Sequence, residues 1–147
     1  MVSRAKTIDV PESAPAADSS VVLVVAASES VAKKIESHLR NRGHAIRTAW
    51  VTDIEDVSES LRRGAPDLVL CGAEAAGNSC KDIIALCQRL APDLPVVMLG
   101  KKTSTEESVV AMALGARDSV AADDDADLHR LELVLLRELA VHRNARD

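Results

Sequence analysis

The chain of 147 residues carries two kinds of side chain that commonly do chemistry, cysteine and histidine. The cysteines, Cys71, Cys80 and Cys87, form no Cys-x-x-Cys pair and have no histidines at metal-site spacing. The histidines are His38, His44, His129 and His142, and no serine or cysteine pairs with any of them by spacing. We therefore predict no catalytic dyad, and we interpret the cysteines as buried cytosolic thiols, with redox sensing as the alternative.

The charged residues that could form a site have simpler interpretations. Asp123, Asp124, Asp125 and Asp127 could gather a cation, but acids ahead of a helix are typical of an N-terminal cap. Asp67 and Asp93 precede expected strands, which favours roles in turns. Lys101 and Lys102 could meet an anion, and a solvated loop is the favoured interpretation.

Composition excludes several classes of function. The net charge is −5 with no long basic run, which argues against a nucleic-acid surface. One tryptophan and no tyrosine or phenylalanine leave little for stacking a base or a flat cofactor, so we expect no cofactor. No apolar stretch follows Met1, and the longest apolar run, at 21–27, is short for a membrane span. We expect a cytoplasmic protein with no membrane insertion.

Apolar, β-branched stretches alternate with stretches of helical period along the chain. Strands are expected at 21–25, 45–51, 68–71, 96–99 and 118–121, with Val24, Val69 and Val97 fully buried. Helices are expected to begin near Ser28 or Ser30 and near Asp53, and to span about 79–90, 105–114 and 126–143. This alternation predicts an α/β three-layer sandwich with a parallel sheet over residues 20–143. Residues 1–19 are expected to be a flexible arm, and 144–147 a tail or the start of a linker.

Ligands of such sheets bind beyond the carboxyl ends of the strands. The residues that follow the first, third, fourth and fifth expected strands are Ala26, Ala27 and Ser28, then Gly72 and Ala73, then Gly100 and Lys101, and finally Ala122 and Asp123. Apart from Ser28, Lys101 and Asp123, these residues are alanines and glycines, which cannot act as a nucleophile, a general base or a side-chain metal ligand.

Several segments together resemble the receiver domains of bacterial response regulators. They are residues 22–25, 43–46, 66–70, 95–99 and 113–118. The last of these segments reads Ala-Leu-Gly-Ala-Arg-Asp. The resemblance covers 21–143 and implies a flavodoxin-like (CheY-like) fold with strand order 2-1-3-4-5 and five helices. It also implies a role in two-component signal transduction.

The family's reactive residues are replaced here. The resemblance places Ala26 and Ala27 at the positions of the family's magnesium-binding acids, and Gly72 at the position of its phosphoryl-accepting aspartate. Gly100 falls at the switch hydroxyl, Ala122 at the phosphate-neutralising lysine, and Ser119 at the aromatic switch residue. We therefore expect no enzyme, no metal and no aspartyl phosphate, but a pseudo-receiver. The alternatives are a receiver with displaced phosphorylation chemistry and a small-ligand sensor of flavodoxin type.

A further run, 46–57, is similar to degenerate receivers at the N-terminus of FimX-type proteins. Those proteins continue through PAS, GGDEF and EAL domains and act in cyclic-di-GMP signalling. The later domains are not in this chain. The resemblance implies a dimerisation or docking module that works with other signalling domains or proteins.

The last expected helix has more apolar residues than one buried face needs. Leu128, Leu131 and Leu135 form one stripe, and Leu133, Leu136 and Ala140 form another. The second stripe is either a wide core contact or an interface. We predict a homodimer through this helix, the last strand and the preceding helix, with Val109, Val110 and Ala113 in the contact. Trp50, the only aromatic residue, either packs on the sheet edge or joins a partner surface.

Overall fold

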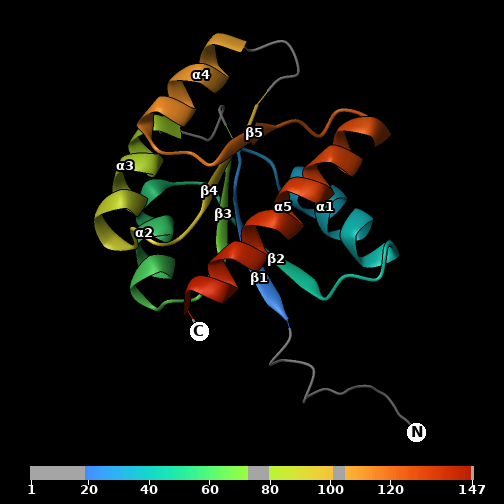
Figure 1. The fold of residues 1–147 in the computed structure, drawn as a ribbon, viewed down its shortest axis with the longest axis horizontal. Helices are drawn as coiled ribbons and strands as arrows, with labels where there is room; N and C mark the ends of the chain where they lie inside the picture. Colours follow the sequence, from blue (N-terminus) through green and yellow to red (C-terminus); the bar gives the residue numbers. More distant parts are fainter. Residues whose placement is uncertain (1–18, 73–79, 101–104, 147) are drawn as a thin grey trace, which may run out of the picture.

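The computed structural model describes residues 19–72, 80–100 and 105–146, and five strands alternate with five helices (Figure 1). The strands are β1 (Ser20–Val25), β2 (Ile46–Val51), β3 (Leu68–Gly72), β4 (Val96–Leu99) and β5 (Asp118–Val120). The helices are α1 (Glu29–Asn41), α2 (Ile54–Arg62), α3 (Cys80–Leu90), α4 (Thr105–Leu114) and α5 (Asp125–Arg146).

All strands pair in parallel, in the order β2-β1-β3-β4-β5. This order confirms the flavodoxin-like fold expected from the sequence. One row of paired residues crosses the sheet near the carboxyl ends of its strands. It runs from Val25 to Cys71, then to Met98 and finally to Ser119. Loops that leave these strands therefore meet at one edge.

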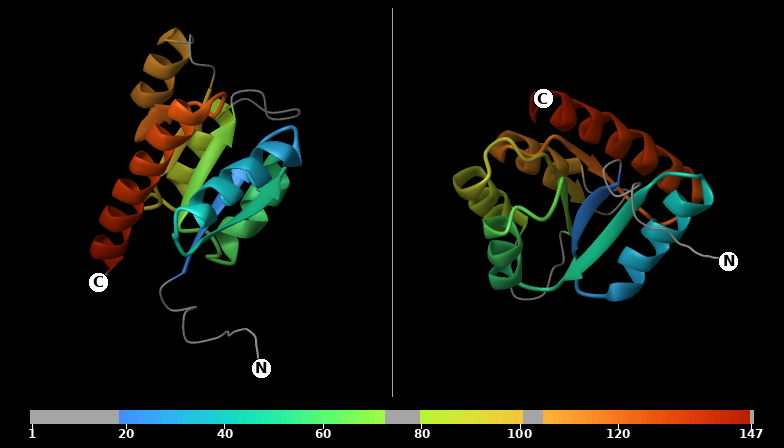
Figure 2. Two further views of the ribbon diagram at one scale, coloured as in Figure 1. Left: turned by 90° about the vertical axis from the view of Figure 1, so that its right-hand side faces the viewer. Right: turned by 90° about the horizontal axis from the view of Figure 1, so that it is seen from below.

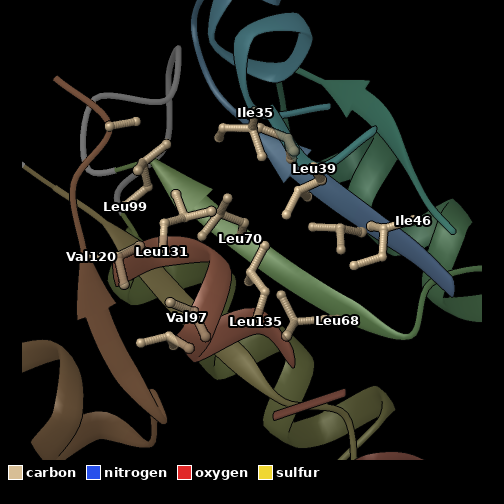
Figure 3. Packing of buried hydrophobic residues seen from close by; sticks show 14 of the residues in the cluster. Ile35, Leu39, Ile46, Leu68, Leu70, Val97, Leu99, Val120, Leu131 and Leu135 are labelled. Atoms are coloured by element: carbon tan, nitrogen blue, oxygen red, sulfur yellow. The ribbon is translucent and has the colours of Figure 1, made fainter. Parts of the chain in front are cut away.

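The core consists of two apolar layers, one on each face of the sheet. Residues of α1 and α5 pack on one face, where Figure 3 shows Ile35, Leu70 and Leu131 meeting over the strands. Residues of α2, α3 and α4 pack on the other face, and Figure 2 shows the helices on both sides of the sheet. Both faces of the central strands are thus covered, which explains why their sequences are apolar at successive positions.

Helix caps and turns follow the sequence closely. The Ser28 hydroxyl accepts from the backbone N–H of Ser30, and the Asp53 carboxylate accepts from Asp56, each at the start of a helix. Asp127 accepts from the backbone of Asp123 and Asp124 before α5. The Asp124 carboxylate accepts in turn from the Asp127 N–H, so these acids form the N-terminal cap that the sequence predicts.

The Asp67 carboxylate accepts from the Val21 N–H and thereby joins the turn before β3 to β1. Some boundaries differ from the expected ones: α5 begins at Asp125 and runs to Arg146, past the expected end at 143. Residues 1–18 of the expected arm, and Lys101 and Lys102, lie outside the described residues. Within the described part of the chain, no helix combines the length and apolarity that crossing a bilayer requires.

Truncation of a central valine tests the strand assignment. Val24, Val69 and Val97 are each 0% exposed, as expected. Val97→Ala should lower the free energy of unfolding by about 1–3 kcal/mol, because buried methyl groups are lost and a cavity remains. Urea unfolding followed by the fluorescence of the single tryptophan, Trp50, measures the change. Val141→Ala, at a side chain that is 47% exposed and is not among the predicted contact residues, is the control and should change stability by no more than about 0.5 kcal/mol. Equal effects of the two substitutions would contradict the assignment.

Candidate functional site

The carboxyl edge of the sheet brings together the positions that the sequence singled out. Ala26 follows β1 and is buried, Ala27 is exposed, and Gly72 is the last residue of β3, paired with Leu99. Ala122 follows β5 and is buried. Strand geometry thus places Ala26, Gly72, Gly100 and Ala122 at one edge, but none carries a functional group.

Gly72 is held closely against β1. A Cβ atom at this position would lie 2.9 Å from the Val25 carbonyl oxygen and 3.7 Å from the Ala26 Cβ atom. The first contact is with backbone, which cannot rotate away as a side chain can. The neighbouring strand therefore favours glycine here, and it leaves no room for a side chain in the present arrangement of β1 and β3.

Magnesium, which the receiver resemblance implies, does not fit the positions that the resemblance assigns to its ligands. Hard cations need carboxylate oxygens, and Ala26, Ala27 and Gly72 supply none. We therefore derive no step that involves this ion.

Side chains from other elements hydrogen-bond backbone carbonyls at this edge. The Trp50 indole donates from Nε1 to the Ala26 carbonyl at 3.0 Å, and Trp50 is 37% exposed. The Lys34 ammonium, from α1, donates to the Ala122 carbonyl at 2.7 Å. Neither contact has a local signal in the sequence, although the strand register that pairs Trp50 with Val24 brings Trp50 near the end of β1.

The switch positions are also altered. The Gly100 N–H donates to the Val120 carbonyl, which continues the β4–β5 ladder by one bond. Ser119 is partly buried on β5, its N–H donates to the Asp118 carboxylate, and its carbonyl accepts from Arg130. Neither residue has an aromatic ring, and Gly100 also lacks a hydroxyl group.

The predicted interface residues divide into exposed and half-buried ones. In α4, Val109 is 62% and Val110 55% exposed, and Ala113 is exposed. In α5, Leu133 is 54% exposed and Ala140 is exposed. Leu136, by contrast, is half-buried and packs against the core layer under α1 and α5.

The exposed apolar surface on α4 is broader than the sequence suggested. Met112 and Leu114 are also exposed, and among the described side chains of this helix only Ala111 is buried. Apolar patches of this kind, when not scattered singly, usually mark contact surfaces.

Charged residues of both signs lie between α4 and α5. On β5, Asp118 bonds Arg130 at 3.2 Å and Arg137 at 3.0 Å. Burial would raise the pKa of Asp118, but the Ser119 N–H and the two arginines outweigh it and lower that pKa. Glu138 of α5 accepts from Arg137 and pairs with Arg117. These ion pairs bring both signs of charge together at β5 and α5.

A second charged cluster joins α5 to α1, and sequence reasoning missed it. Glu132 is 3% exposed and accepts from His44 Nε2 at 2.6 Å and from His38 Nε2 at 3.1 Å. Arg42 Nε lies 3.2 Å from both of its carboxylate oxygens, and His129 Nδ1 lies 3.8 Å from one. Within the described residues no group of histidine, cysteine and acidic side chains is arranged to hold a metal ion, and here the Arg42 guanidinium already faces the carboxylate.

The cluster keeps Glu132 ionised. Burial alone would raise the pKa of Glu132, but the hydrogen bonds from His44, Arg42 and His38 outweigh it and lower the pKa from 4.5 to about 2. A carboxylate with such partners stabilises the folded state only while it is charged.

No protein-family model matches the chain. Among solved structures, it is similar to the receiver domain of NtrX from Brucella abortus, with 27% identity, a TM-score of 0.69, and coverage of 81% of this chain and 98% of that one. It is also similar to the receiver domain of a Francisella response regulator, with 16% identity, a TM-score of 0.69, and coverage of 82% and 97%. A longer NtrX chain from Brucella abortus matches at 25% identity and a TM-score of 0.74, over 87% of this chain but 28% of its own.

These similarities, together with the strand order, show that the chain has the fold of response-regulator receiver domains.

The Glu132 cluster predicts a pH dependence of stability. The folded-state pKa of Glu132, about 2, lies below its ordinary value of 4.5, so its contribution is present above pH 4.5 and is lost as the pH falls toward 2. Glu132→Gln should lower the free energy of unfolding at pH 7 by about 1–3 kcal/mol, because hydrogen bonds to charged partners are lost. It should also flatten the decline below pH 4.5. Urea midpoints measured across this range test both effects.

The control for this prediction is Glu59→Gln, at an exposed acid on α2. It should leave both the stability and its pH profile close to those of the wild type. The same acid-induced decline in Glu132→Gln as in the wild type would show that other carboxylates dominate the pH dependence.

Proposed function

We propose that this chain is a non-phosphorylatable, receiver-like regulatory domain that acts as a dimerisation or docking module in bacterial signal transduction. The observation that carries the proposal is the close approach of Gly72 to the Val25 carbonyl, at the position where the receiver resemblance places the phosphoryl acceptor. A domain whose reactive edge is replaced by packed backbone would act through its surface, as a binding module and not as an enzyme.

The neighbouring positions support the same proposal. A carboxylate cannot be restored at residue 72 without moving β1 or β3, and the alanines after β1 offer a metal no oxygen from their side chains. The Ala26 and Ala122 carbonyls already accept from Trp50 and Lys34. This edge is therefore built as part of the folded core.

The surface around α4, β5 and α5 supports a second copy of the chain as the partner. It combines exposed apolar side chains, among them Val109, Val110 and Leu133, with ion pairs that carry both signs of charge. In a two-fold contact the same patch occurs on both subunits, so a surface with both signs of charge can complement itself. The similarity of 46–57 to FimX-type receivers extends the proposal to cyclic-di-GMP signalling.

Treatment with acetyl phosphate and Mg²⁺ tests the chemical part of the proposal. Intact mass should show no phosphoryl adduct on the wild type or on Gly72→Asp. Gly72→Ala should lower the free energy of unfolding by about 1–3 kcal/mol, because the added Cβ overpacks the contact with β1. Trp50 fluorescence reports both stability and any change near the end of β1.

A phosphorylated wild type would favour displaced phosphorylation chemistry, and peptide mapping would locate the acceptor. A coloured or ligand-loaded purified protein would favour the small-ligand sensor instead. Unchanged stability in Gly72→Ala would show that the approach of β1 to β3 does not exclude a side chain.

Substitution of Leu133 tests the dimer. Leu133→Glu should weaken self-association by about tenfold or more, roughly 1.4 kcal/mol, because each subunit would bury an unpaired charge. The fold should survive, since Leu133 is 54% exposed. Light scattering over a concentration series measures the association, and circular dichroism checks the fold.

Leu90→Glu is the matched control, because Leu90 is an exposed leucine on α3, away from the predicted face. It should leave the dimer intact. A wild type that stays monomeric at high micromolar concentration would remove the homodimer and leave docking to another protein.

A further inference from the structure

Two of the three cysteines lie in contact at the carboxyl edge of the sheet. Cys71 is the residue before Gly72 at the end of β3, and Cys80 is the first residue of α3. The Cys80 thiol donates to the Cys71 carbonyl oxygen at 3.6 Å, and the Cys71 thiol donates to the Gly72 carbonyl oxygen at 3.8 Å. All three cysteines are reduced in the structure and belong to the core layer under α2, α3 and α4.

Helix geometry decides which pair could be bridged. Cys80 and Cys87 are seven positions apart on α3, which separates them by about 10.5 Å along the axis. A disulfide requires Cα atoms within roughly 7 Å, so these two cannot be joined without unwinding the helix. Cys71 and Cys80 lie on different elements, and the Cys80 thiol already contacts the backbone of Cys71.

We propose that Cys71 and Cys80 form a reversible disulfide when the protein meets a small peroxide oxidant. The bond would join the end of β3 to the start of α3. It would give this edge a covalent modification of its own, at the place where the phosphoryl acceptor is absent. The proposal concerns thiol chemistry alone and holds whether or not the domain dimerises.

The order of the steps follows from the surroundings of the thiols. The hydrogen bond with Cys80 and burial raise the pKa of Cys71 well above its usual range, and burial and the charge of Cys80 raise the pKa of Cys87 to about 12. Cys80 is 8% exposed while Cys71 is 0% exposed, and it begins a helix, whose amino end favours a thiolate. Cys80 is therefore the thiol that reacts first.

The reaction is balanced with peroxide as the oxidant. The Cys80 thiolate attacks one oxygen of hydrogen peroxide, the O–O bond breaks, and hydroxide leaves, which gives a sulfenic acid. The Cys71 sulfur then attacks the Cys80 sulfur, the S–O bond breaks, and water leaves with the Cys71 proton and the hydroxyl group. Two thiols are oxidised and one peroxide is reduced to two waters.

Peptide mapping of the native protein tests the proposal directly. Trypsin cleaves after Arg63, Lys81 and Arg89, so Cys71 and Cys80 share peptide 64–81 while Cys87 lies in peptide 82–89. After peroxide treatment, denaturation and alkylation with N-ethylmaleimide, the chain should carry one adduct, on peptide 82–89, instead of three. Peptide 64–81 should lack two hydrogen atoms, and dithiothreitol should restore all three alkylation sites.

Variants separate the two thiols. Cys87→Ser is the matched control and should still form the bond. Cys80→Ser should abolish it, and Cys71→Ser should leave a sulfenic acid on Cys80 that dimedone traps. If a variant fails to fold by circular dichroism, the wild-type peptide map alone decides. Three alkylated cysteines, oxygen gained without a disulfide, or a bond that includes Cys87 would each overturn the proposal.

Discussion

The burial of β1, β3 and β4 between two helical layers is the constraint on which the rest of the structure depends. A parallel sheet covered on both faces must be apolar throughout, and Val24, Val69 and Val97 are accordingly 0% exposed. Because the strands are parallel, their carboxyl ends all lie at the same edge of the sheet. Ligand binding in a fold of this kind therefore depends on the few residues that follow the strand ends at Val25, Cys71, Leu99 and Val120.

At that edge, Gly72, Ala26 and Ala122 make their contacts through the backbone. Gly72 allows β3 to approach the Val25 carbonyl more closely than a residue with a Cβ atom would. The carbonyls of Ala26 and Ala122 accept from Trp50 and Lys34, so polar groups at the strand ends are satisfied from within the domain. Each contact suits a position without a carboxylate, because a buried carboxylate without a cation would be costly. Cys71 and Cys80 add two buried thiols to the described part of this edge.

The parts of the fold that the sequence predicted are those with a local signal. Apolar runs marked the strands, and Ser28 and Asp53 marked helix starts, because a cap is recognised from residues two or three positions away. The Glu132 cluster had no such signal, since His38 and His44 are 94 and 88 residues away from Glu132 along the chain. The contact between Cys71 and Cys80 depends likewise on how α3 packs on β3, which residue spacing alone does not determine. Leu136 was grouped with Leu133 by helical spacing, yet the width of the α1 contact leaves it half-buried.

Charged contacts on its two flanks fix the orientation of α5. On the side toward α1, Glu132 bonds His38, Arg42 and His44, and on the side toward β5, Arg130 and Arg137 bond Asp118. A third side of α5 faces the sheet through Leu128, Leu131 and Leu135. Because α5 is held on these three sides, its fourth side is directed toward solvent. Leu133 and Ala140 lie on that side. Their exposure is therefore a consequence of how α5 is anchored, because rotating α5 to cover Leu133 would break both sets of ion pairs. Within the described residues nothing covers these two side chains, which is the physical basis for proposing that they belong to an interface.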